Sequence, residues 1–378
     1  MKNESKKPKF YSIERIMREA PDALYYMIIG ERSNGKTFSV LEYALRDYLS
    51  KGHQLAIIRR WDEDLKGRRG EEVFSGFVNN RFRGNILKTL SKGEYNDFFL
   101  YSGKWYLQNK NERGEVLKRD TRPFAFRFSL TSGEHDKMGS YTGVKTIFFD
   151  EFLTDKYYLP DEFKLFMNTI STIVRTGEDT GTDKEVKIFM CGNTINKYSP
   201  YFAEMGLKNV RSMKKDVIDI YEYGDSGLKV AVEYSSFPAG KKKSDKYFAF
   251  DNPALKMITS GEWEIAVYPH KPLDFTPFDI VYIYFLVFSG ETLQAEIIIK
   301  EDKTFTFIHR KTTPIKDDGS LVYQEEYSPI PNYARLINRP RNIVEKRIWS
   351  FFQRGLVFYQ DNEIGDIVRN YINWCQTQ

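Results

Sequence analysis

Residues 30–37 read GERSNGKT, and this phosphate-loop pattern constrains the fold more than any other part of the chain. The pattern G-x-x-x-x-G-K-[ST] binds phosphate only where a β-strand precedes it and an α-helix follows it. Both are predicted here: "LYYMII" (24–29) is apolar and β-prone, and apolar residues recur at helical spacing after Thr37. By chance, such a string would occur in a chain of this length roughly once or twice in a hundred. The strand and helix on its two sides favour a nucleotide-binding loop over coincidence.

The loop supplies the groups that a nucleotide phosphate requires. Gly30 and Gly35 let the backbone curl, so that successive N–H groups face a phosphate, and the helix that follows adds positive potential. Lys36 is expected to reach the β- and γ-phosphates, and the Thr37 hydroxyl to hold Mg²⁺. The candidate nucleotide-binding residues of the loop are Gly30, Arg32, Ser33, Asn34, Gly35, Lys36 and Thr37.

An acidic pair follows a second apolar strand, in "VKTIFFDEFL". Residues 147–149 predict a short buried strand that ends at Asp150 and Glu151. Because ligands collect at the carboxyl ends of parallel strands, both carboxylates are expected to face the phosphates. Asp150 is suited to hold Mg²⁺ through its water shell, and Glu151 to orient or deprotonate the attacking water. Alone, such a pair is typical of a solvated strand end.

A third strand, within "KEVKIFMCGNT", ends in Asn193 and Thr194. The Asn193 amide would either contact the γ-phosphate or hold the water, or else begin an ordinary turn; the sequence leaves both open. The following "NKYS" (196–199) is similar to the guanine-reading N-K-x-D of GTPases. Because Ser199 stands where the base-reading Asp is needed, we expect ATP and not GTP.

These motifs, in this order, resemble the additional-strand, catalytic-glutamate branch of P-loop ATPases, and within it the DNA-packaging ATPases of small podoviruses. The resemblance rests on GERSNGKT, "QLAIIRRW" (54–61), "HDKMGSYTGVKTIFFDEF" (135–152), "TIVR" (172–175) and "MCGNTINKYSPYF" (190–202). It implies a homo-oligomeric ring, a pentamer, docked on the viral portal in the host cytoplasm. Such a motor uses ATP and Mg²⁺ to move double-stranded DNA into a preformed capsid, with a structural packaging RNA as a further partner.

The resemblance also implies residues that act across the interface between subunits. Arg175 matches an arginine finger, Lys137 a second basic residue, and Glu151 the catalytic glutamate. A guanidinium from a neighbouring subunit would stabilise the charge that develops in phosphoryl transfer, although a lone Arg is more often a solvated side chain. Glu31 departs from the family because it places a negative charge in the loop, so we expect its side chain to point outward.

The loop "DEDLKGRRGEE" carries Lys66, Arg68 and Arg69, which are candidate DNA-binding residues. On a loop that faces a pore, they could grip DNA phosphates in a salt-dependent, sequence-tolerant way. The alternative is a solvated loop of mixed charge. "AGKKKSDKY" (239–247) is a second candidate, or a basic linker. The net charge of +5 permits a nucleic-acid partner without requiring one.

The length of 378 residues predicts more than one domain. We expect a P-loop α/β domain at 1–202, a connector at 203–245 and a β-rich domain with a helical end at 246–378. "DIVYIYFLVF", "LQAEIIIK" and "TFTFIHR", separated by tight turns, predict an antiparallel meander. Two Cys and four His indicate neither a disulfide framework nor a zinc site, and no apolar run is long enough for a bilayer. A soluble, non-secreted protein is expected.

Large packaging motors carry an RNase H-like nuclease in the C-terminal position, and a nuclease needs carboxylates that converge on two metal ions. Asp279, Glu291 and Glu296 are scattered, so we expect a nuclease-like fold without nuclease activity that docks to the portal or to RNA. The basic run Arg335, Arg339, Arg341, Lys346 and Arg347 would suit a nucleic-acid backbone, or form a solvated helix face. Two other functions stay open: a terminase whose C-terminal domain cuts DNA, and a nucleotide-gated DNA-binding switch.

Overall fold

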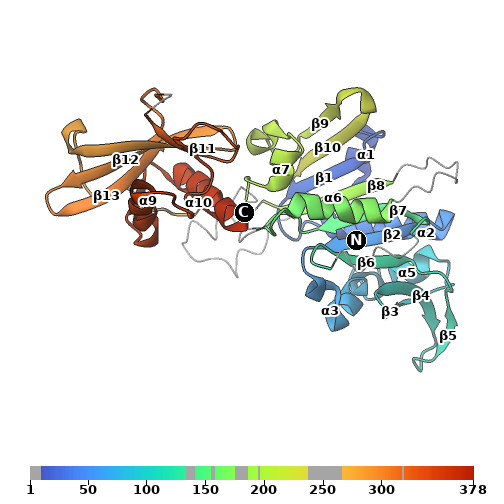
Figure 1. Ribbon diagram of the computed structural model, residues 1–378. Helices are drawn as coiled ribbons and strands as arrows, with labels where there is room; N and C mark the ends of the chain where they lie inside the picture. Colours follow the sequence, from blue (N-terminus) through green and yellow to red (C-terminus); the bar gives the residue numbers. More distant parts are fainter. Residues whose placement is uncertain are drawn as a thin grey trace, which may run out of the picture. The chain divides into compact units, whose positions relative to one another are not determined.

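The computed structural model describes residues 10–132, 141–154, 158–174, 186–194, 196–236, 266–316 and 319–378. The chain divides into two compact units. The strands of the first are coloured from blue to yellow in Figure 1, and those of the second from orange to red. The first unit comprises 1–154, 162–195 and 207–262, and the second 155–161, 196–206 and 263–378.

A ten-stranded mixed sheet forms the centre of the first unit, in the order β3-β4-β6-β2-β7-β8-β1-β10-β9, with β5 paired to β4. Six central strands are parallel: β6 (Ala125–Ser129), β2 (Gln54–Arg59), β7 (Val144–Asp150), β8 (Lys187–Asn193), β1 (Tyr25–Gly30) and β10 (Leu228–Ser235). Antiparallel strands flank them: β9 (Ile218–Tyr223), β4 (Lys104–Lys110), β3 (Asp97–Tyr101) and β5 (Val116–Arg119). One strand, β8, lies between β1 and β7.

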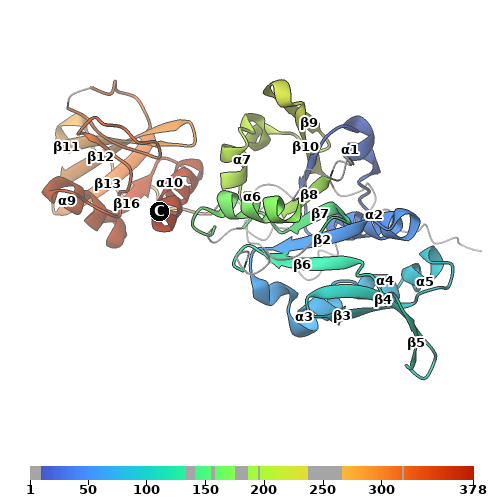
Figure 2. The same cartoon turned by 45° about the vertical axis from the view of Figure 1, so that its right-hand side comes forward.

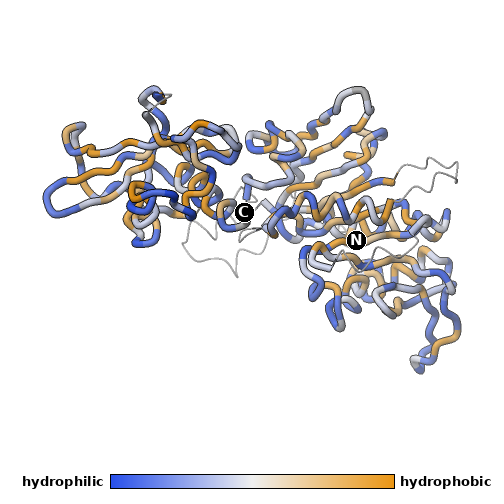
Figure 3. Tube along the Cα trace, in the orientation of Figure 1, coloured by the Kyte–Doolittle hydropathy of each residue, from blue (hydrophilic) through white to orange (hydrophobic). Residues whose placement is uncertain are grey.

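Both faces of the parallel strands are covered, which is why these strands are continuous apolar runs, orange in Figure 3. On one face, Tyr26 and Phe148 share a hydrophobic cluster with Val40 of α2 (Lys36–Lys51). On the other, Phe149 stacks on Phe166 of α6 (Glu162–Ile173), with ring centroids 5.2 Å apart. The predicted P-loop strand, helix and two following strands are therefore confirmed, and so is the α/β class.

The remaining helices among the described residues of the first unit are short. They are α1 (Glu14–Glu19), α3 (Gly67–Glu72), α4 (Ser75–Val78) and α5 (Ile86–Leu90), with 3-10 turns at Asp62–Leu65, Lys208–Ser212 and Gly224–Ser226. Strands β3 and β4 form an antiparallel hairpin, which lies in Figure 2 at the edge of the sheet below β6.

The predicted connector at 203–245 is wrong for its middle part. Within it, β10 pairs along its whole length with β1, and β9 pairs with β10. The stretch 228–235 reads LKVAVEYS and is buried from Val230 onward, so it is a strand of the main sheet. Residues 196–206, which hold α7 (Pro200–Glu204), cluster with the second unit instead of the first. Both differences depend on contacts between residues far apart in the sequence, which local sequence patterns do not encode.

Gly30, at the end of β1, lies between two neighbouring strands, opposite Asn193 and Ser235. A Cβ at this position would lie 2.3 Å from the backbone oxygen of Ser235, which cannot move without distorting β10. Gly30→Ala is therefore expected to lower the free energy of unfolding by about 1–3 kcal/mol in urea titrations. Gly76→Ala is the control, because the nearest atom to its Cβ is the edge of Phe38 at 3.9 Å. Equal stabilities of the two variants would contradict this account.

The second unit contains a six-stranded sheet in the order β15-β14-β11-β12-β13-β16. The strands are β11 (Ile280–Phe288), β12 (Glu291–Lys300), β13 (Lys303–Arg310), β14 (Leu321–Gln324), β15 (Tyr333–Ala334) and β16 (Val357–Tyr359). The first three form the predicted antiparallel meander, joined by tight turns. Helices α9 (Ile343–Gln353) and α10 (Asn362–Thr377) confirm the helical end. Strand β15 precedes α9, and β16 lies between the two helices in the sequence.

Among the helices that the structure describes, none is both long and apolar enough to cross a bilayer.

Candidate nucleotide-binding and hydrolysis site

The loop between β1 and α2 curls tightly around the ammonium group of Lys36. Ser33 and Gly35 have positive φ angles of 61° and 99°, which the turn requires. Lys36 is buried, and its Nζ donates to the carbonyl oxygens of Gly30 at 3.1 Å and Glu31 at 2.6 Å. Asn193 Oδ1 lies 3.4 Å from the same Nζ. The third strand end predicted from the sequence is thus brought to the loop, as expected.

Two other side chains of the loop point into the protein. Asn34 is 1% exposed; its Nδ2 donates to Ser235 Oγ at 3.0 Å, and its Oδ1 accepts from the N–H of Lys36 at 3.2 Å. Glu31 is also buried, and its carboxylate lies 3.7 Å from Lys215 Nζ. A cation, and not solvent as we expected, therefore offsets the charge of Glu31. Arg32 and Ser33 are exposed.

Thr37 and Asp150, the two residues predicted to hold Mg²⁺, lie in contact. Thr37 Oγ1 donates to Asp150 Oδ1 at 3.0 Å, so the first turn of α2 and the end of β7 present two oxygen atoms side by side. Hydroxyl and carboxylate oxygens are ligands that Mg²⁺ prefers, and Mg²⁺ usually takes one or two protein oxygens together with substrate phosphate and water. The residues present therefore fit a Mg²⁺–nucleotide complex.

Arg59, at the end of β2, is a site residue that the sequence reasoning missed. Its guanidinium donates to Asp150 Oδ2 at 2.8 Å and to Glu151 Oε2 at 2.7 Å. Burial raises the pKa of Asp150, and Glu151 adds to this effect, while Arg59, Thr37 and Lys36 partly oppose it. Arg59 thus limits the cost of burying one carboxylate beside another. A signal was present: two arginines follow the apolar strand "QLAII", at the sheet edge where the carboxylates also lie.

Glu151 itself adopts a backbone conformation that is uncommon for its residue type. Its φ angle is 59°, in the left-handed region, and its side chain is 61% exposed. Strain of this kind in a non-glycine residue is held by the surrounding structure and clusters at functional sites. This backbone conformation places the Glu151 carboxylate against Arg59, where it remains exposed, while the neighbouring Asp150 is buried.

A buried ion pair between Arg60 and Glu162 stabilises the same edge of the sheet, where β2 and β7 end. Arg60 donates through Nε and NH2 to the two carboxylate oxygens of Glu162, each at 2.8 Å, and its NH2 also reaches the carbonyl oxygen of Phe152 at 2.8 Å. Both ionic side chains are buried, at 8% and 0% exposure. Because Glu162 is the first residue of α6, Arg60 joins β2, the segment after Glu151 and the start of α6.

Arg59 is expected to act as a positioning residue for the two carboxylates. Removing a residue that hydrogen-bonds to a metal ligand and orients it typically lowers metal affinity or activity 10- to 100-fold. Arg59→Ala should therefore lower kcat/KM for ATP by about 10- to 100-fold and raise the Mg²⁺ concentration needed for half-maximal rate. Arg59→Lys should lose less, since it keeps the positive charge. An unchanged Mg²⁺ dependence in Arg59→Ala would contradict this role.

Arg175 and Lys137, the predicted residues of the interface between subunits, lie outside the described residues, as does the basic stretch 239–247. Helix α6 ends at Ile173, two residues before Arg175.

The predicted DNA-binding residues Lys66, Arg68 and Arg69 lie at the start of α3 and are exposed. Each faces an acidic side chain. Lys66 pairs with Asp62, Arg68 with Glu72 at 2.8 Å, and Arg69 with Asp64 at 3.5 Å. Surface pairs of this kind are worth about 0–1 kcal/mol, so DNA phosphates could replace the carboxylates at little cost.

Replacing Lys66, Arg68 and Arg69 together by Ala is expected to lower affinity for double-stranded DNA equally for all sequences. The slope of log K against log salt should fall by about 0.9 for each phosphate that the variant no longer neutralises, or by about 2–3 in total. Fluorescence anisotropy at several salt concentrations measures this slope. Replacing Lys110, Arg113 and Lys118, on and beside the β4–β5 hairpin, is the control for the removal of charge alone. An equal effect in both triple variants would exclude a specific role for the α3 residues.

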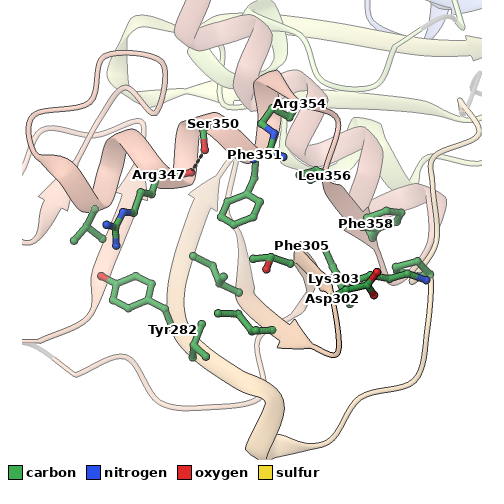
Figure 4. Close-up of a pocket in the computed structure, with 16 residues that line it drawn as sticks. Tyr282, Asp302, Lys303, Phe305, Arg347, Ser350, Phe351, Arg354, Leu356 and Phe358 are labelled. Carbon is green, nitrogen blue, oxygen red and sulfur yellow. Dashed lines mark hydrogen bonds between the residues drawn. The ribbon is translucent and has the colours of Figure 1, made fainter.

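In the second unit, the predicted basic run is divided among different contacts. Arg341 pairs with buried Glu345 at 2.8 Å, and the Arg335 guanidinium lies 5.3 Å from the ring centre of Trp374. Arg347 borders a cavity of about 1000 Å³ between α9 and the meander. Figure 4 shows Arg347 on α9 and Arg354 directly after it at the rim, with Phe305 and Phe351 inside. The run is therefore not one solvated helix face.

Comparisons with known proteins show which proteins this chain is similar to. Residues 109–239 match the family model of the podovirus DNA encapsidation protein (Gp16). The DNA packaging protein of Bacillus phage B103 is 22% identical over 214 residues, which cover 54% of this chain and 56% of that protein. The corresponding protein of Bacillus phage phi29 is 23% identical over 204 residues, covering 53% and 51%. The resemblance to podovirus DNA-packaging proteins is confirmed.

The chain spans about half the length of the curated relatives it matches. Two solved structures extend the likeness in fold to nearly the whole chain. A chain of the bacteriophage Phi-29 viral genome packaging motor assembly has a TM-score of 0.54 at 17% identity, covering 96% of this chain and 99% of that one. A chain of the Phi-28 gp11 DNA packaging motor has a TM-score of 0.53 at 16% identity, covering 97% and 98%. At these identities the likeness establishes a shared fold.

Proposed function

We propose that this chain is an ATP-driven motor that moves double-stranded viral DNA into a preformed capsid. The observation that carries the proposal is the contact between Thr37 and Asp150 beside the Lys36 loop, in a chain that resembles podovirus packaging proteins. The phosphate loop follows β1, and the carboxylate ends β7, which is separated from β1 in the sheet by β8. Nucleotide hydrolysis with Mg²⁺ uses both of these groups.

In this proposal the protein residues divide the work of hydrolysis. Lys36 and the loop N–H groups hold the phosphates, while Thr37 and Asp150 hold Mg²⁺, which would neutralise charge on the phosphates when bound. Glu151 orients a water molecule and accepts its proton, which contributes about 10²- to 10⁴-fold in rate for a placed general base. Asn193, whose Oδ1 lies 3.4 Å from Lys36 Nζ, would contact the γ-phosphate or that water. Arg59 holds both carboxylates in position.

The ring assembly and its residues are part of the same proposal. Arg175 and Lys137 would complete the site of the neighbouring subunit, so that ATP draws two subunits together and loss of the γ-phosphate releases them. The Arg60–Glu162 pair supports this idea, because it anchors the start of the helix that leads to Arg175. Partners would be identical subunits in a pentameric ring, the portal of the procapsid, DNA and a packaging RNA. The motor would dock at the portal in the host cytoplasm.

We propose that the second unit is RNase H-like and lacks nuclease activity. Support comes from its strand order, β13-β12-β11-β14-β15, in which β14 is parallel to β11 and β15 is parallel to β14. An antiparallel meander followed by two parallel strands on the far side of its first strand is typical of that fold. The central strand β11 reads IVYIYFLVF and carries no carboxylate for a metal ion. In the first unit, Lys66, Arg68 and Arg69 at the start of α3 would contact the DNA.

Packaging itself tests the proposal. Purified wild-type protein, linear double-stranded DNA and procapsids of the encoding phage are mixed with Mg²⁺ and ATP, and DNA protected from added nuclease is measured. We expect protection that requires ATP hydrolysis and is lost in Lys36→Ala. Protection that is independent of ATP would favour a nucleotide-gated binding protein instead. Metal-dependent nicking of plasmid DNA by the wild type would favour a terminase with an active nuclease.

A further inference from the structure

Two phenylalanine side chains stand half exposed beside the phosphate loop. Phe10 is 47% and Phe82 53% exposed, and their ring centroids lie 6.2 Å apart at an interplanar angle of 53°. Leaving large aromatic rings in water forgoes hydrophobic stabilisation, so exposed rings that gather at one place on the surface indicate a contact surface for a ligand or partner. Here they gather at one end of the candidate nucleotide site.

Phe10 is held directly against the loop. Its Cβ lies 3.2 Å from the point where a Cβ on Gly35 would lie, so the Phe10 side chain packs on the last glycine of GERSNGKT. The backbone N–H of Tyr11 donates to the carbonyl oxygen of Asn34 at 3.0 Å. Next along the chain, the N–H of Ile13 donates to Ser39 Oγ in the first turns of α2 at 3.0 Å. The segment that carries Phe10 therefore follows the phosphate loop into the helix.

Phe82 reaches the same place from another segment, and its backbone is fixed. Asn80 Oδ1 accepts from the N–H groups of both Phe82 and Arg83 at 3.0 Å. The Arg83 guanidinium then makes two bonds to the carboxylate of Glu42 on α2, at 2.6 and 2.8 Å. The loop after α4 is thus fastened to the same helix that begins at Lys36, and it presents the Phe82 ring from a defined position.

We propose that Phe10 and Phe82 bind the purine base of the nucleotide whose phosphates lie in the GERSNGKT loop. This inference rests on the proposed function, because it assigns the base to a site whose phosphate end is Lys36. Aromatic side chains bind bases by stacking on their faces, and the 53° angle lets one ring stack while the other contacts the edge of the base. Neither ring donates or accepts a hydrogen bond. The pair therefore increases the affinity for a base but contributes little to the discrimination between adenine and guanine.

Calorimetric titrations of the full chain with ATP and with inorganic tripolyphosphate, both with Mg²⁺, test the proposal. Stacking on one aromatic side chain is worth roughly 5- to 150-fold in affinity. Phe82→Ala and Phe10→Ala should each weaken ATP binding by about that factor and leave tripolyphosphate binding within about two-fold. Phe82→Tyr should retain ATP affinity, whereas Phe82→Leu, which keeps apolar bulk without the ring, should lose it. Phe278→Ala, which removes a 99% exposed ring in the second unit, is the control and should change neither.

The outcomes separate this inference from the proposed function. ATP affinity that is unchanged in both alanine variants would overturn the base site while leaving the phosphate site intact. An equal loss of ATP and tripolyphosphate binding would also overturn it, because it would show that the rings support the loop and not the base. A wild-type chain that binds neither ligand would overturn both proposals together.

Discussion

Glu151→Gln is expected to lower kcat for ATP hydrolysis by about 10²- to 10⁴-fold, the usual contribution of a general base. The amide has nearly the shape of the carboxylate but cannot accept the proton of the attacking water. Glu151 is 61% exposed and outside the core, so folding should not change. Binding of Mg²⁺ and ATP, measured by calorimetry, should stay within a few-fold of wild type, since Thr37 and Asp150 are untouched.

Glu222→Gln is the matched control for this experiment. Glu222 is 67% exposed and pairs with Lys229 at 3.1 Å, on β9 and β10, so its replacement removes a similar surface ion pair elsewhere in the same unit. It should leave the single-turnover rate unchanged. Hydrolysis by Glu151→Gln at nearly the wild-type rate would show that another group accepts the proton, and Glu151 would then be only a partner of Arg59.

Glu162→Ala is expected to produce the largest loss of stability. Removing one member of a buried ion pair strands the other charge, which typically costs about 3–5 kcal/mol in the free energy of unfolding. Here the stranded group would be Arg60, which is 8% exposed. The double variant Arg60→Met with Glu162→Leu should recover most of the loss, because apolar residues of similar size often replace a buried pair at little cost.

Glu72→Ala provides the comparison, since Glu72 also pairs with an arginine at 2.8 Å but on the surface, where Arg68 is 89% exposed. It should cost about 0–1 kcal/mol. Urea denaturation followed by circular dichroism measures all of these variants. If Glu162→Ala were no more destabilising than Glu72→Ala, the pair would not anchor α6, and its proposed support for Arg175 would fall.

The sequence predicted those parts of the site that are encoded locally. GERSNGKT carries its own loop chemistry, and the apolar runs before Asp150 and Asn193 predict strands that end in polar residues. Because parallel strands end at one edge, placing these groups together needed no knowledge of the tertiary structure. The contacts of Lys36 with Asn193 and of Thr37 with Asp150 confirm the placement, although not the chemistry.

Other features arise only from long-range contacts. Arg59 and Arg60 are adjacent in the sequence, yet one faces Asp150 and Glu151 and the other is buried against Glu162, because successive side chains at a strand end point to opposite faces. Apolar and polar residues alternate only weakly in 228–235, and it is the pairing with β1 that makes this segment a strand of the main sheet. Phe10 and Phe82 likewise meet only through the fold.

The most direct test of a hydrolytic site completed between subunits is the ATP hydrolysis rate per subunit, measured against protein concentration with and without double-stranded DNA. A motor that needs Arg175 and Lys137 from a neighbour should show a rate per subunit that rises steeply with concentration and rises further with DNA. Adding inactive Arg175→Ala subunits at constant total concentration should then lower the rate more than in proportion to their share. A rate per subunit that stays flat and ignores DNA would contradict the motor and leave a self-contained P-loop enzyme.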